Sequence, residues 1–131
     1  MNTSLEIFTK KFEAAIKTTL DAIDLDAIDD ILDARDTDAF SELWMKAWKK
    51  VEHIKINIDA QREEFFKLIF SKTQSSDLAA YLIEDFELIA KHLNEEEDNW
   101  VTNLCATYFE HEIPHGELKT KKIKLIELIT Q

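Results

Sequence analysis

Residues 76–115 read SDLAAYLIEDFELIAKHLNEEEDNWVTNLCATYFEHEIPH and carry the strongest helical pattern of the chain. Apolar side chains recur there at steps of three and four, the spacing of one buried helix face. In the first half these are Leu78, Tyr81, Leu82, Phe86, Ile89 and Leu93, and Asp85 lies on the same line. In the second half they are Trp100, Val101, Leu104, Cys105 and Tyr108. The segment predicts a helical hairpin joined at residues 94–98.

The sequence also carries signals for the ends of these two helices. Ser76 or Asp77 is expected to cap the first helix, because a short side-chain oxygen accepts a free N–H of the first turn. Four acids at residues 95–98 precede the second helix, where they complement the positive end of the helix dipole. Pro114 and Gly116, the only proline and glycine, are expected to end it.

Composition predicts an all-α fold in one domain. The 131 residues suit a single domain, and 45% hydrophobic residues can form a core without a disulfide or a metal. One glycine and one proline leave little of the turn chemistry on which β-hairpins depend. We therefore expect a single-domain bundle of six to seven helices over residues 1–131. The loop at residues 73–76 is the best place for a boundary between subdomains.

Four further segments complete the predicted bundle. A first helix begins near Ser4, a second covers Phe40 to Val51, and Asn57 or Asp59 caps a third; the C-terminal segment favours a fourth. Isoleucines at residues 54, 56 and 58 alternate with polar residues, as does part of residues 122–130. A minor two-stranded element between these two segments is the alternative.

Net charge and cysteine content limit the partners and the compartment. A formal charge of −11 disfavours direct binding of nucleic acid, because affinity for phosphate comes mainly from lysine and arginine, and it favours a basic partner. No stretch approaches the ~18 apolar residues of a membrane span. The single cysteine and the absence of an apolar N-terminal run predict a reducing, cytoplasmic location.

Several enzyme classes lack their required residues. Phosphate-binding loops, dinucleotide-binding fingerprints and nucleophile elbows need several glycines, and the chain has one. Zinc sites built on paired cysteines are excluded by the single Cys105. This thiol lies on an apolar stripe, which favours a buried side chain over a nucleophile. We expect no cofactor and no catalytic residue.

One cluster keeps a metal-dependent helical enzyme open as an alternative hypothesis. It contains Glu110, His111, Glu112 and His115, and Glu112-x-x-His115 has the spacing of di-iron bundle ligands. The chain has no second motif of this spacing, and Pro114 breaks the helix that would orient these side chains. A polar helix end is the favoured interpretation.

Two acidic blocks give the leading functional hypothesis. Residues 21–38 and 84–98 hold fifteen acids against Arg35 and Lys91. A charge run is often only a solvated surface, but two such blocks in one domain can steer a basic partner. The candidate partner-binding residues are Asp26, Asp29, Asp30, Asp33, Glu95, Glu96, Glu97 and Asp98.

In size, acidity and predicted helical content the chain resembles bacterial immunity proteins. The resemblance implies a non-enzymatic protein that occludes a basic partner, most concretely a nuclease toxin. A structural adaptor or homo-oligomer that pairs through Trp44, Trp48 or the C-terminal helix is the second hypothesis. The spacing of these two tryptophans along one apolar stripe also fits a place in the core.

Overall fold

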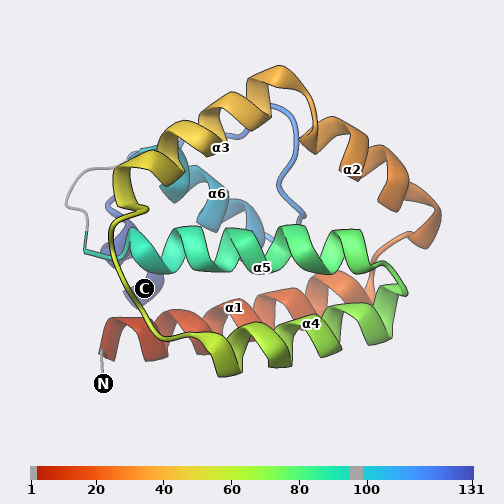
Figure 1. Ribbon diagram of the computed structural model, residues 1–131, viewed down its shortest axis with the longest axis horizontal. Coiled ribbons are helices and arrows are strands. Elements are labelled where there is room, and N and C mark those ends of the chain that lie inside the picture. Colours follow the sequence, from red (N-terminus) through yellow and green to blue (C-terminus); the bar gives the residue numbers. More distant parts are fainter. Residues whose placement is uncertain (1–2, 95–98) are drawn as a thin grey trace.

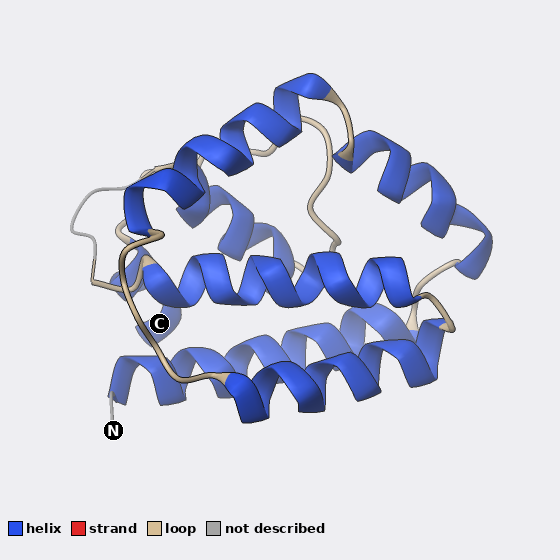
Figure 2. Ribbon diagram, viewed as in Figure 1, coloured by secondary structure: helices blue, strands red, loops and turns tan. Residues whose placement is uncertain are grey.

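The computed structural model describes residues 3–94 and 99–131 (Figure 1). Within these two ranges the chain forms seven α-helices and one short 3-10 helix, without a strand (Figure 2). The elements are α1 (Thr3–Asp21), η1 (Leu25–Ala27), α2 (Ile28–Arg35), α3 (Asp38–Val51), α4 (Asp59–Thr73), α5 (Ser76–Lys91), α6 (Trp100–Phe109) and α7 (Leu125–Thr130). The predicted all-α class and helix number are confirmed.

Helix α5 runs through the middle of the molecule. It contacts α1 and α4 on one side and α2 and α3 on the other, and α6 also packs against it (Figure 1). The turn at Gln74 and Ser75 brings α4 alongside α5 as an antiparallel pair. Helix α7 packs on α1 and α6. Helix α5 is therefore covered on both sides and is the helix around which α1, α2, α3, α4 and α6 are arranged.

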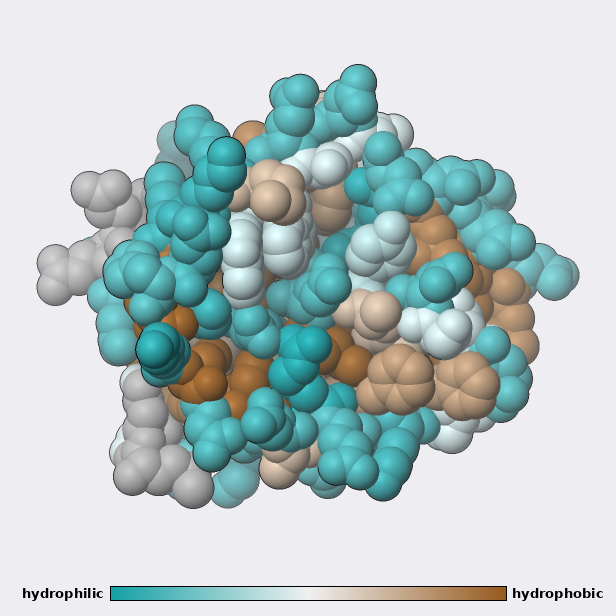
Figure 3. Space-filling view, in the orientation of Figure 1, coloured by the Kyte–Doolittle hydropathy of each residue, from teal (hydrophilic) through white to brown (hydrophobic). Residues whose placement is uncertain are grey.

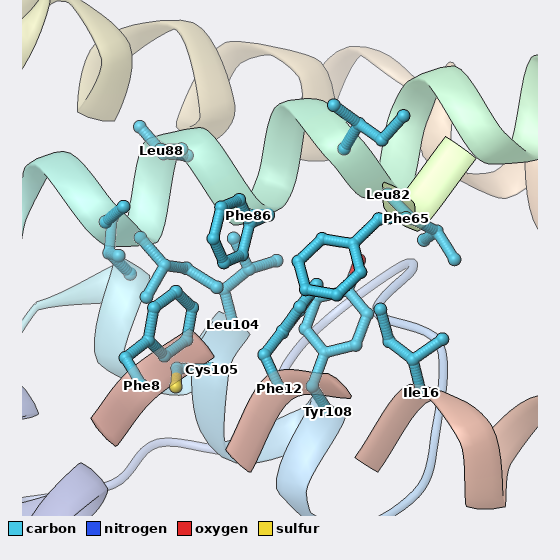
Figure 4. Close-up of a cluster of buried hydrophobic side chains, with 14 of the residues drawn as sticks. Phe8, Phe12, Ile16, Phe65, Leu82, Phe86, Leu88, Leu104, Cys105 and Tyr108 are labelled. Carbon is cyan, nitrogen blue, oxygen red and sulfur yellow. The ribbon is translucent and has the colours of Figure 1, made fainter. Parts of the chain in front are cut away.

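Aromatic side chains fill the centre of the core between α1, α4, α5 and α6 (Figure 4). The ring of Phe12 lies 5.6 Å from Phe65, 5.2 Å from Phe86 and 4.9 Å from Tyr108, measured between ring centroids. Phe8 stacks on Phe86 at 5.3 Å. Such offset or edge-to-face pairs add about 0.5–1.5 kcal/mol each beyond the burial of apolar area. The core thus joins helices from both sides of the turn at residues 74–75.

Burial on α5 is wider than the predicted stripe. Leu78, Leu82, Phe86 and Ile89 are buried as expected. A second set on the same helix is buried as well, namely Ala79, Ile83, Leu88 and Ala90. These residues are covered because α5 is packed on two sides, which a one-sided pattern does not reveal.

Polar side chains cap the N-terminal ends of α5 and α6, and the cap of α5 lies one residue earlier than predicted. Ser75, not Ser76 or Asp77, caps α5: its hydroxyl accepts from the Leu78 N–H at 3.1 Å. Asn99 caps α6 by accepting from the Val101 N–H at 2.8 Å. Ser75 is in the extended conformation that an N-cap requires, whereas Ser76 is already helical.

Helix α6 ends at Phe109, five residues before Pro114, so the predicted end was wrong. His111 adopts a left-handed conformation with φ of 66°. Its N–H donates to the Tyr108 carbonyl at 2.9 Å, and the Glu112 N–H donates to the Thr107 carbonyl at 3.2 Å. These two bonds form a Schellman motif, which satisfies the last carbonyls of the helix before the proline is reached.

The other differences are local. Ile58 is the N-cap of α4 and makes no side-chain cap bond, so neither Asn57 nor Asp59 serves as the cap. Residues 54–58 form an irregular connector, and among the described residues they pair with no strand. The C-terminal helix is confirmed only over six residues, as α7. Searched over the described ranges, no helix is long and apolar enough to cross a membrane.

Candidate partner-binding groove

A buried ion pair fastens α2 to α5. Arg35, the last residue of α2, is 4% exposed, and Asp85 of α5 is 0% exposed. Arg35 donates from Nη2 to Asp85 Oδ1 at 2.8 Å and from Nη1 to Asp85 Oδ2 at 2.9 Å. Its Nη1 also donates to the Pro114 carbonyl at 2.9 Å. This bidentate geometry is the strongest pairing of a guanidinium with a carboxylate.

Side chains of two more helices donate hydrogen bonds to the same carboxylate. Trp44 of α3 donates from Nε1 to Asp85 Oδ1 at 2.9 Å, and the Tyr108 hydroxyl of α6 donates to Oδ2. Burial would lower the pKa of Arg35, but the Asp85 carboxylate more than offsets this, and the pKa is raised. Burial, and then the Asp85 charge, raises the pKa of Tyr108, which stays a neutral donor. Asp85 thereby fixes α2, α3 and α6 around α5.

The anchored α2 helix forms one wall of an acidic groove of about 540 Å³, and α5 forms the other. Five carboxylates line it, and the remaining lining is Leu32, Ala80 and Tyr81; the acids are Asp29, Asp33, Asp36, Asp77 and Glu84. Hydrophilic side chains cover most of the exposed surface of α2, with apolar side chains between them (Figure 3). The only cation of residues 21–38 is Arg35, which is buried, so it does not offset this charge at the surface.

The walls of the groove perturb two of its groups. Desolvation, followed by the negative charge of the neighbouring Asp85, raises the pKa of Glu84. Tyr81 donates from its hydroxyl to Asp36 Oδ1 at 2.7 Å, and this bond raises the pKa of Tyr81. Ionised Glu84 thus lies in surroundings that disfavour its charge, and a bound cation would relieve that cost.

A second pocket of about 210 Å³ adjoins the groove at the start of α3. It shares Asp36, Tyr81 and Glu84 with the groove. Its other walls come from Arg35 and from four residues of α3, namely Phe40, Ser41, Trp44 and Met45. The acidic groove therefore continues into a pocket whose walls include three aromatic residues, Phe40, Trp44 and Tyr81.

Comparison with known protein families supplies the identification. The model of the family described as immunity protein PIM1 matches residues 6–115. The chain belongs to this family. Comparison with curated proteins finds no match. The matched region contains Arg35, Asp85 and both pockets, and it ends before α7. Membership supports an immunity role and implies a toxin as the partner.

The predicted binding residues of this PIM1 family member divide into three groups. Asp29 and Asp33 line the groove. Asp26 and Asp30 are exposed but do not line it. Glu95, Glu96, Glu97 and Asp98 lie outside the described residues.

Three acids of the groove were absent from the predicted set. They are Asp36, Asp77 and Glu84, of which only Asp77 was predicted to have a role, as a possible helix cap. Each carried an acidic signal in the sequence, but only the packing of α2 on α5 brings them beside Asp29 and Asp33.

The four residues of the alternative metal site are not gathered into a metal-binding cluster in the described part of this chain. They follow the end of α6, where Glu110 pairs with Lys121 at 3.1 Å and His115 Nδ1 lies 2.7 Å from the Ile113 carbonyl. Over the ranges the structure describes, no three potential ligands lie together as a metal site. Cys105 is fully buried, and burial raises the pKa of its thiol, which leaves it unreactive.

The surfaces suggested for self-association are largely engaged within the chain. Trp44 stacks on Trp48 at 5.7 Å, and the Lys91 ammonium lies 4.3 Å from the centre of the Trp48 ring. In α7, Leu125 and Ile129 are buried. Both tryptophans are half-buried against the core, which agrees with the core interpretation of their spacing.

Proposed function

We propose that this protein neutralises a basic toxin by binding it through the acidic groove between α2 and α5. A nuclease is the most concrete candidate, since enzymes that act on nucleic acid present cationic surfaces to phosphate. The five carboxylates that line one groove in a member of an immunity family carry the proposal. The protein is expected to act as a non-enzymatic inhibitor in the cytoplasm.

Charge gives such an inhibitor speed and selectivity. A net charge of −11 and a cleft lined by one sign of charge attract a cationic partner before contact. Complementary charges also disfavour wrong partners. The fixed, short aspartates of α2 present their charge on a helix that the Arg35–Asp85 pair holds in place.

The proposal is tested by capture from a lysate of the source organism at low and at high salt, with mass spectrometry of the bound proteins. We expect a basic protein that is retained at low salt and weakened at high salt, because screening reduces attraction between exposed charges. The captured protein should be toxic when expressed alone and harmless when co-expressed with this chain. Recovery of only the chain itself at both salts would contradict the proposal and favour the homo-oligomer.

A further inference from the structure

Two phenylalanines of α4 are exposed side by side. Phe66 is 37% exposed and Phe70 is 39% exposed, and their rings stack with centroids 6.1 Å apart. Neither ring belongs to the buried core, and Figure 3 shows an apolar patch over α4 on the same face as α2 and α5. Single exposed apolar residues are ordinary on protein surfaces, whereas aromatic residues are enriched where partners bind. This phenylalanine pair is therefore a candidate contact surface.

An ion pair between α4 and α5 shows where the phenylalanine pair lies. Arg62 of α4 donates from Nη1 to Glu87 Oε1 of α5 at 2.7 Å. Phe66 and Phe70 follow Arg62 at steps of four residues, so the three side chains share one line of α4. On the antiparallel α5, steps of three and four residues back from Glu87 lead to lining residues of the acidic groove, namely Glu84, Ala80 and Asp77. The phenylalanine pair and the groove thus lie on either side of one exposed stripe of α5.

A hollow of about 320 Å³ extends the groove toward the end of α4. It shares Asp29 and Asp77 with the groove, and Thr73 and Gln74 belong to its wall on the α4 side. The Gln74 N–H donates to the Phe70 carbonyl at 2.8 Å, which places this wall one turn from the phenylalanine pair. A partner seated in the groove can therefore reach the two rings over a continuous surface.

Area and charge indicate what covers the rings. A phenylalanine presents about 200 Å², so the exposed part of the pair is roughly 150 Å², far below the about 1,200–2,000 Å² of a stable interface. The pair does not hold two copies of the chain together by itself, and a second copy would bring its own charge of −11 toward the acidic groove. A basic protein meets both features at once, because its cations suit the groove and its apolar side chains suit the rings.

We infer that Phe66 and Phe70 are the apolar contact of the toxin-binding surface. Apolar side chains of the toxin cover the two rings, and its cations lie across the α5 stripe in the acidic groove. The inference rests on the proposed function and adds an apolar patch beside the cations of the partner. The carboxylates then govern how fast the toxin arrives and the rings how long it stays, since apolar contact is not screened by salt.

Matched variants test the rings against the captured toxin. F66Q/F70Q removes both rings and keeps good helix formers, and L43Q changes a similarly exposed residue of α3 that lines neither the groove nor the hollow. With unchanged thermal unfolding, F66Q/F70Q should weaken toxin binding by about tenfold or more at low and at high salt, mainly through faster dissociation, and L43Q by less than about twofold. Equal affinities of the two variants, or a loss confined to the association rate, would overturn the inference, while neutralisation by the parent chain keeps the proposed function.

A photo-cross-linker tests the contact in a chain that keeps an aromatic side chain at the site. The amino acid p-benzoylphenylalanine replaces Phe66 in one protein and Leu43 in another, and each is irradiated with the captured toxin. We expect a covalent link to the toxin from position 66 and none from position 43. Links from both positions, from neither, or from position 66 to a second copy of the chain would overturn the inference. If the parent chain captures no basic protein, the proposed function itself fails, and the inference fails with it.

Discussion

At the scale of single residues, Asp85 connects more helices than any other side chain described above. Its carboxylate accepts from Arg35, Trp44 and Tyr108, which belong to three different helices. The sequence placed Asp85 on the line of Leu82 and Ile89, so a buried charge in need of a partner could be predicted. Its partner could not, because Arg35 lies among aspartates that suggest an exposed ion pair.

Replacement of Asp85 by asparagine should be strongly destabilising. The change leaves the Arg35 charge buried without its counter-ion, and breaking a buried pair costs about 3–5 kcal/mol. Urea denaturation gives the free energy of unfolding. The control is E87Q, which removes the partly exposed ion pairs of Glu87 with Arg62 and Lys91 and should cost less than about 1 kcal/mol. Equal losses in the two variants would show that Asp85 is not the anchor.

Glu84 gives a prediction about pH. Its pKa is raised in the folded state, so the folded chain holds this proton more tightly than the unfolded chain. Its ionisation therefore destabilises the fold as pH rises through that pKa. E84Q should be more stable than the parent at pH 7, and the difference should shrink as pH falls below the ordinary range of glutamate. Unfolding curves across pH give the stability difference from the parent for E84Q and for the exposed-site control E63Q. The same dependence of this difference on pH in both variants would refute the prediction.

At the scale of elements, the apolar periodicity predicted the helices well and their ends less well. The buried face of α5 follows the expected spacing from Leu78 to Ile89, and the buried residues of α1 show the same helical spacing from Phe8 to Leu20. The ends depend on backbone conformation that several adjacent residues can adopt. Ser75 and Ser76 are chemically alike, and nothing in the order of residues says that His111 takes a left-handed conformation.

The cap of α5 can be tested with two neighbouring serines. S75A removes the acceptor for the Leu78 N–H and should cost about 0.5–2 kcal/mol. S76A changes an exposed residue within the first turn and should have a much smaller effect, since alanine is a good helix former. Free energies of unfolding measured for the two variants show which substitution costs more stability. A larger loss in S76A would restore the cap predicted from sequence.

The same limit applies to the groove. Asp29 and Asp33 were identifiable because they belong to the acidic block at residues 21–38. Their partners Asp77 and Glu84 come from α5, more than forty residues away in the chain. Only the crossing of α2 over α5 brings the two sets together, and that crossing is set by the unforeseen contact of Arg35 with Asp85.

At the scale of the whole molecule, the placement of charge matters beyond its total. Asp26 and Asp30 carry the same charge as Asp29 and Asp33 and lie on the same short stretch, but only the latter pair lines the groove. Long-range attraction depends on the summed field, whereas residence of the partner depends on the groups it contacts. The two pairs of aspartates can therefore be separated by kinetics.

Charge reversal of each pair should slow association with the captured toxin to a similar extent at low salt. D29K/D33K should in addition speed dissociation, and D26K/D30K should leave it nearly unchanged. Surface plasmon resonance at several salt concentrations measures both rates, and circular dichroism confirms that the variants remain helical. Identical dissociation rates for the two variants would exclude the groove as the contact surface.

The residues that hold α2 in place differ from those that it exposes to solvent: the buried Arg35–Asp85 pair does the first, and the aspartates of α2 are exposed. The anchor lies wholly inside the molecule, and the aspartates on the outer face of the helix take no part in it. Substitutions on that outer face can accumulate without cost to the fold. Under the proposed function, substitutions at a few exposed positions of this short helix would therefore change which toxin is bound while the fold is kept.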